Sequence, residues 1–187
     1  MFDGPQGGCG VVIAVDGLGR AAGDTLSVVG DGAGKESAAY QPHAAVNGNG
    51  VVYVEIGGGG TRTITFTGLE PVDMSGMATA TITLPNANDV LFVDGGFDDA
   101  TGLIPALIVS GMSGGFAFEQ VHFFNNDEVE IDTTGMPGDD MITIGMTTAA
   151  DNAHGNTDLS IITGTGAHTG RGVGHPSAPI NGEISIA

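Results

Sequence analysis

The stretch Ala78-Thr79-Ala80-Thr81-Ile82-Thr83-Leu84 decides the fold class of this chain. Apolar side chains occupy every second position and threonine fills the positions between them, so the two kinds point to opposite faces of an extended strand. Threonine also suits the pleated, half-exposed surface of a sheet. The stretch therefore predicts a β-strand that turns one face to a core.

Short runs of the same β type recur along the chain, separated by turn residues. They lie at residues 11–15, 26–29, 51–56, 61–67, 90–93, 107–109, 116–124, 129–131, 142–146, 159–162 and 184–186. No helical stretch of 10–15 residues separates them, which disfavours a parallel βαβ fold. We therefore expect an all-β protein, an antiparallel β-sandwich of the jelly-roll type.

The chain of 187 residues has the length of one large domain. Residues 1–56 are expected to form an N-terminal β segment of the same domain, and residues 61–187 the main sandwich. The glycine tract Gly57–Gly60 between them is a hinge or a turn. Residues 164–179, rich in Gly, Thr, His and Pro, are expected to form a loop.

The charge balance excludes several kinds of partner. The formal net charge is −18, and there is no Lys or Arg between Arg62 and Arg171. Binding to nucleic acid depends on cations that displace the counterions of the phosphates, and binding to an anionic membrane surface depends on the same cations. We therefore expect neither nucleic acid nor an anionic membrane as a partner.

No motif indicates catalysis, and we expect a protein that is not an enzyme. Gly30-Asp31-Gly32-Ala33-Gly34-Lys35 resembles a phosphate-binding loop, but Val29 stands where that motif needs a glycine, and Glu36 stands where it needs Ser or Thr. The five histidines lack the spacing of a zinc site, and Cys9 is the sole cysteine. A hydrolase using carboxylates such as Glu128 is the alternative, and no feature requires it.

Clusters of acidic residues are the strongest chemical signal in the sequence. Ca²⁺ binds six to eight oxygen ligands, most often on flexible loops. The candidate calcium ligands are Asp94, Asp98 and Asp99 in one predicted turn, Asp127 beside Glu128, and Asp139 with Asp140. None of these clusters matches the EF-hand or the nonapeptide calcium repeat. The alternative is that they are solvated acidic turns, so calcium is the one cofactor that the sequence suggests.

The segment Thr65-Phe66-Thr67-Gly68-Leu69-Glu70-Pro71-Val72-Asp73-Met74-Ser75-Gly76, followed by the strand 79–84, resembles part of a jelly-roll module of bacterial secreted and surface proteins. In those modules a strand often runs into an Asp-x-Ser-Gly turn and then into an alternating strand. The resemblance covers residues 61–163 at most, and it implies a sandwich without transferring any ligand residues.

The composition favours a protein that faces outward, on a virion surface or outside the cell. The N-terminus lacks the basic and apolar regions of a signal peptide. Virion proteins assemble inside the host without such a signal, and an acidic chain suits the outer shell better than the genome-facing side. We expect a structural subunit of a virion capsid, decoration or fibre, which self-associates or binds another capsid or surface protein. The alternative is a secreted or cell-surface module that binds calcium or carbohydrate.

Overall fold

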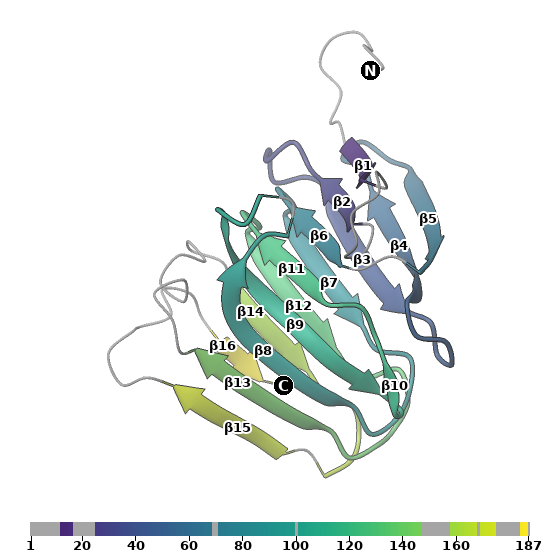
Figure 1. Cartoon of the computed structure of the whole chain (residues 1–187), viewed down its shortest axis with the longest axis vertical. Helices are drawn as coiled ribbons and strands as arrows, with labels where there is room; N and C mark the ends of the chain where they lie inside the picture. Colours follow the sequence, from purple (N-terminus) through teal and green to yellow (C-terminus); the bar gives the residue numbers. More distant parts are fainter. Residues whose placement is uncertain are drawn as a thin grey trace, which may run out of the picture.

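The protein is an all-β sandwich, as the sequence predicts. The computed structural model describes residues 12–16, 25–68, 71–99, 101–146, 158–167, 169–174 and 184–186. Within these residues there is no helix, and the strands form one nine-stranded sheet, here sheet A, and one seven-stranded sheet, sheet B. The two sheets pack face to face (Figure 1).

The strands of sheet A are β1 (Val12–Asp16), β2 (Thr25–Val29), β6 (Val72–Ser75), β8 (Val90–Phe97), β9 (Pro105–Ser113), β10 (Phe116–Ala117), β11 (Val121–Phe124), β13 (Met141–Met146) and β15 (Thr169–Gly174). The strands of sheet B are β3 (Ser37–Pro42), β4 (Asn49–Glu55), β5 (Thr61–Thr67), β7 (Thr79–Thr83), β12 (Glu128–Asp132), β14 (Asp158–Ile162) and β16 (Ile184–Ile186).

The chain alternates between the two sheets, so that its strands follow a helical path, here called the coil, with one strand in each sheet per turn. It passes from β2 in sheet A to β3 in sheet B, and repeats this step from β6 to β7, β11 to β12, β13 to β14 and β15 to β16. Successive turns of the coil therefore pair in parallel, as β3 with β7 and β7 with β12 do. The expectation of antiparallel sheets is wrong for these pairs, because each crossover runs through the opposite sheet and needs no helix.

Antiparallel hairpins are added to this coil. Strands β4 and β5 extend sheet B beside β3, and the Gly57–Gly60 tract is the turn that joins them. Strands β8 and β9 are inserted in sheet A between β11 and β13, whereas in sheet B the corresponding strands β12 and β14 pair directly. One hairpin thus widens sheet A alone.

The core lies between the sheets and is built by alternation along the strands. In β7, Ala80 and Ile82 are buried and the threonines are half-exposed, as the sequence predicts. In β4, glycine is required at position 50, because a Cβ there would lie 2.5 Å from Cε2 of Tyr40 and 2.9 Å from Cζ of Phe66. These two rings stack with their centroids 5.8 Å apart, and the backbone of Gly50 lies against them.

The corners where the chain leaves sheet A stack on one another. The N–H of Gly30 donates to the carbonyl of Ser75 (2.8 Å), and the N–H of Gly76 donates to that of Asn125 (3.2 Å). Gly76 and Asn125 both have a positive φ, of 69° and 56°. The buried amide of Asn126 then joins two neighbouring corners, as its Oδ1 accepts from the N–H of Met77 and its Nδ2 donates to the carbonyl of Met74, each at 3.0 Å.

Several local predictions are corrected. Asp94, Gly95 and Gly96 belong to strand β8 and do not form a turn. The predicted strand 116–124 is two strands, β10 and β11, which pair with different segments of β9. Part of the predicted loop 164–179 is strand β15, held by its parallel pairing with β13, and residues 175–179 lie outside the described part of the chain.

Candidate functional site

The most unusual chemical feature of the described residues is a pair of buried carboxyl groups, Asp89 and Asp140. Both lie at corners where the chain returns from sheet B to sheet A, and their side chains are 0% and 3% exposed. Oδ1 of Asp140 accepts from the N–H of Asp89 (3.0 Å), and its Oδ2 accepts from the hydroxyl of Thr133 (2.7 Å). The backbone carbonyl of Asp89 accepts in turn from the N–H of Met141 (2.8 Å).

The environment favours a neutral Asp89. The pKa of Asp89 is raised from 3.8 to about 6; burial is the main cause, the neighbouring charge of Asp140 acts in the same direction, and the polar groups of Ser113 and Gly114 act against it. A carboxyl group with such a pKa holds its proton through mildly acidic pH. Asp89 can therefore gain or lose a proton near pH 6.

The predicted calcium ligands do not converge on one point. Asp139 lies beside the buried pair, where its Oδ1 accepts from the N–H of Ala167 (2.9 Å), whereas Asp94 and Asp127 are exposed elsewhere. In the part of the chain that the structure describes, no three His, Cys, Asp or Glu side chains are grouped so that they could hold a metal ion. Calcium binding stays a prediction.

Asp98 has a structural environment of its own. Its carboxylate accepts four hydrogen bonds, from the N–H and hydroxyl of Thr101 (2.7 and 2.8 Å) and from the N–H groups of Leu103 (3.0 Å) and Ile104 (2.7 Å). Burial alone would raise the pKa of Asp98, but these bonds hold it below its usual value. The carboxylate shapes the loop after β8, and its oxygens are engaged by donors of the chain itself.

Asp99, from the same loop, joins a second buried polar group on sheet A. Its Oδ2 accepts from the hydroxyl of Thr25 (2.6 Å), and its N–H lies 3.4 Å from Oδ1 of Asp73. Nδ1 of His122 is 3.0 Å from that same oxygen of Asp73, and its Nε2 is 3.1 Å from Oε1 of Gln120. The imidazole thus faces a carboxylate and an amide. The partner at Nε2 is not a hydroxyl or thiol, so this group lacks the order of a Ser-His-Asp triad.

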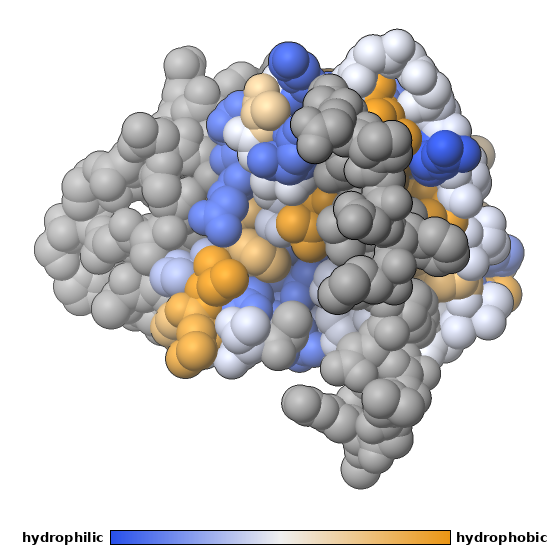
Figure 2. All heavy atoms as spheres, turned by 90° about the horizontal axis from the view of Figure 1, so that it is seen from above, coloured by the Kyte–Doolittle hydropathy of each residue, from blue (hydrophilic) through white to orange (hydrophobic). Residues whose placement is uncertain are grey.

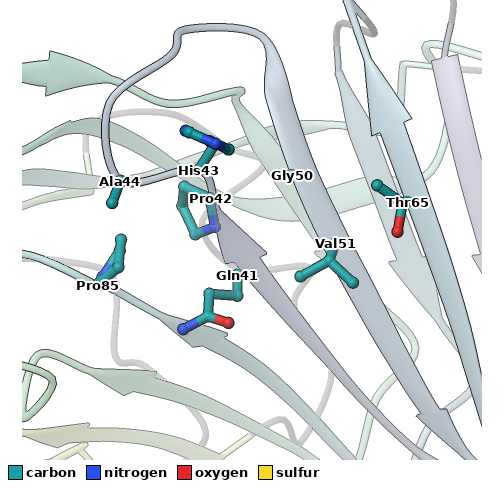
Figure 3. A pocket seen from close by; sticks show the side chains of 8 residues that line it. All are labelled: Gln41, Pro42, His43, Ala44, Gly50, Val51, Thr65 and Pro85. Carbon is teal, nitrogen blue, oxygen red and sulfur yellow. The ribbon is translucent and has the colours of Figure 1, made fainter.

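A shallow pocket of about 380 Å³ opens beside β3, β4 and β5 (Figure 3). Its lining residues are Gln41, Pro42, His43, Ala44, Gly50, Val51, Thr65 and Pro85. The lining holds no carboxylate, and Nδ1 of His43 already accepts from the N–H of Ala45 (3.1 Å). The pocket is therefore a hollow lined by apolar and a few neutral polar groups. Its lining lacks the paired acid and base that general acid–base catalysis uses.

Sequence reasoning found Asp139 and Asp140 but missed Asp89, Asp73 and the role of His122. Asp73 falls in the predicted Asp-x-Ser-Gly turn and His122 in the predicted strand 116–124, so neither position predicts a buried polar group. The structure buries them, because the loop after β8 lies over this part of sheet A, and Asp73 is 1% and His122 4% exposed. An isolated aspartate such as Asp89 carries no sequence signal that separates it from a turn residue.

Comparisons with known proteins add no family. Neither the protein-family models, nor the curated proteins, nor the solved structures give a match to this chain. Among the described residues, no helix has the length and apolar character needed to cross a membrane. The function has to be argued from the geometry of this chain alone.

Proposed function

We propose that this protein is a structural, non-enzymatic subunit of a surface assembly, of the kind found in a virion capsid, decoration or fibre. The observation that carries the proposal is the set of strands at the ends of the two sheets. Among the described residues, sheet B ends on β5 at one side and on β16 at the other, and sheet A ends on β1 and β15. Each end strand carries backbone groups ready to pair with a further strand.

The surface chemistry supports this use. The net charge of −18 disfavours polyanionic partners, whereas large apolar side chains reach the surface between hydrophilic ones (Figure 2). On the outer face of sheet A, Val90 of β8 pairs with Met112 of β9 on one side and with Met141 of β13 on the other. Phe92, two residues further along β8, lies on the same face. The exposed fractions of Phe92, Met112 and Met141 are 50%, 42% and 43%. Such side chains are typical of surfaces that become covered.

The test is the native mass, measured by light scattering across a range of protein concentrations, in Ca²⁺ and then in chelator. We expect masses above the 18.6 kDa of one chain that rise with concentration. Loss of the assembly in chelator would place Ca²⁺ at the contacts. A mass of one chain in both buffers at every concentration would overturn the proposal.

A further inference from the structure

Strand β5 forms an open edge of sheet B. Among the described residues it pairs with β4 along all seven of its residues, and no strand pairs with its other side. Figure 1 shows β5 at the outer rim of the sheet, with no other described strand beyond it. Seven residues make this a long edge for a globular protein, in which exposed edges are usually short or interrupted.

The backbone groups at this edge belong to the four threonines of β5. The bonds from the N–H of Ile56 to the carbonyl of Gly60 and from the N–H of Gly68 to that of Gly48 set the phase of the β4–β5 ladder. Hydrogen-bonded pairs alternate with non-hydrogen-bonded pairs in antiparallel strands. Even-numbered residues of β5 therefore bond to β4, and the N–H and C=O groups of Thr61, Thr63, Thr65 and Thr67 point outward.

The side chains of β5 give this edge little protection. All four threonines are exposed on the outer face, and the inner face carries exposed Arg62, half-buried Ile64 and buried Phe66. Natural edges are commonly blocked by proline, by several charges or by a bulge. β5 has no proline and one charged residue, and its pairing with β4 is regular throughout.

We propose that β5 pairs with β5 of a second copy of this chain, antiparallel about a two-fold axis at Ile64. This register opposes Thr63 to Thr65 and Thr61 to Thr67, so the outward N–H and C=O groups of the two edges meet as hydrogen-bonded pairs. Threonine–threonine pairs across antiparallel strands are favourable. An isologous contact of this kind closes after two copies and joins two seven-stranded sheets into one.

The inner face and the charges fit the same register. Ile64 meets its own copy as a non-hydrogen-bonded pair, the arrangement in which facing side chains lie closest. Arg62 faces Phe66 of the other copy, so the two guanidinium groups are not opposed. Two chains of net charge −18 still repel over longer distances, and added salt screens that repulsion. Dimerisation should therefore strengthen as salt is raised from low concentration.

This inference rests on the proposed role as an assembling subunit, and charge-swapped variants test it. Thr63→Lys with Thr65→Lys places lysine opposite lysine in the dimer, and Thr63→Glu with Thr65→Glu places glutamate opposite glutamate. Each pair of substitutions should weaken dimerisation at least about tenfold. An equimolar mixture should restore dimers, because lysine then faces glutamate. The readout is sedimentation velocity, with circular dichroism to confirm folding.

The control makes the same change within sheet B. Thr79→Lys with Thr81→Lys alters the half-exposed threonines of β7, three strands from the edge, and should keep the wild-type mass. If the edge variants keep it as well, the β5 contact is wrong although the assembly stands. If the wild type is a single chain throughout, both proposals fail. Monomeric edge variants that do not recover on mixing also refute the β5 contact.

A cysteine at the axis gives an independent readout. In a chain with Cys9→Ser, Ile64→Cys should form a disulfide-linked dimer under mild oxidation, because facing Cα atoms in a non-hydrogen-bonded pair are about 4.5 Å apart. Thr61→Cys in the same background should not, since position 61 faces position 67. Equal cross-linking at both positions would contradict the two-fold axis at Ile64.

Discussion

The buried carboxyl group of Asp89 should make the protein less stable as pH rises. Its pKa is raised from 3.8 to about 6 in the folded chain, so folding favours the protonated form. Below pH 3.8 the carboxyl group is protonated in both the folded and the unfolded chain, so it does not change the free energy of unfolding. Between pH 3.8 and about 6 the unfolded chain releases this proton while the folded chain keeps it, so stability falls across that window. Above pH 6 the folded state holds a buried charge beside Asp140, and the loss levels off. A shift of this size corresponds to about 2–3 kcal/mol at pH 8.

The perturbation is Asp89→Asn, which keeps the shape and removes the charge. We expect the variant to unfold with a free energy about 2–3 kcal/mol above that of the wild type at pH 8, and with a nearly equal value at pH 4. Urea titrations at pH 4, 6 and 8, followed by circular dichroism, give the difference directly. The convergence at low pH separates a charge effect from a change in packing.

Asp94→Asn is the matched control. Asp94 lies in β8, the strand that begins directly after Asp89, and its side chain is exposed. It should change the free energy of unfolding by less than about 0.5 kcal/mol at every pH. The reasoning is refuted if Asp89→Asn is less stable than the wild type at pH 8. It is equally refuted if the difference between the two proteins does not vary with pH.

Three further predictions concern packing, the corners and calcium. Gly50→Ala should lower the free energy of unfolding by about 1–3 kcal/mol, because the added methyl group meets Tyr40 and Phe66; unchanged urea midpoints would contradict this packing. Asn126→Ala should cost about 2–4 kcal/mol, since two buried backbone groups lose their partner. Asn126→Asp should not rescue the stability, because its buried carboxylate can accept from the N–H of Met77 but has no proton to donate to the carbonyl of Met74; an unchanged urea midpoint in either variant would contradict this role. Millimolar Ca²⁺ should raise the melting temperature relative to chelator if an acidic cluster binds it; equal temperatures would end that hypothesis.

The fold class could be predicted because alternation is a local property. The strand 61–67 has the predicted bounds, and β7 buries the predicted alanine and isoleucine. Strand β6 was missed, because Asp73 and Ser75 in Val72–Ser75 suggest a turn, whereas the structure buries all four residues. Strand β15 was missed for a similar reason, since its glycines are held by pairing with β13 and not by their own preference for extended structure.

Long-range pairing could not be predicted from the same pattern. Nothing in the alternation of β3 and β7 says that they pair in parallel, because that depends on the return of the chain through β6 in the opposite sheet. The candidate site depends on such pairings too. Asp89 and Asp140 come together because neighbouring turns of the coil stack their corners, and only Asp140 stood in an acidic cluster of the sequence.

The hairpin inserted in sheet A has a consequence for the order of folding. Strands β8 and β9 are neighbours in sequence and can pair early, since local contacts lose little chain entropy on closing. Strand β11 pairs with β9 on one side and with the more distant β6 on the other. The hairpin therefore offers β11 an edge before the coil is closed. We expect refolding to begin around β8 and β9, and the parallel contact between β6 and β11 to form in a later, slower step.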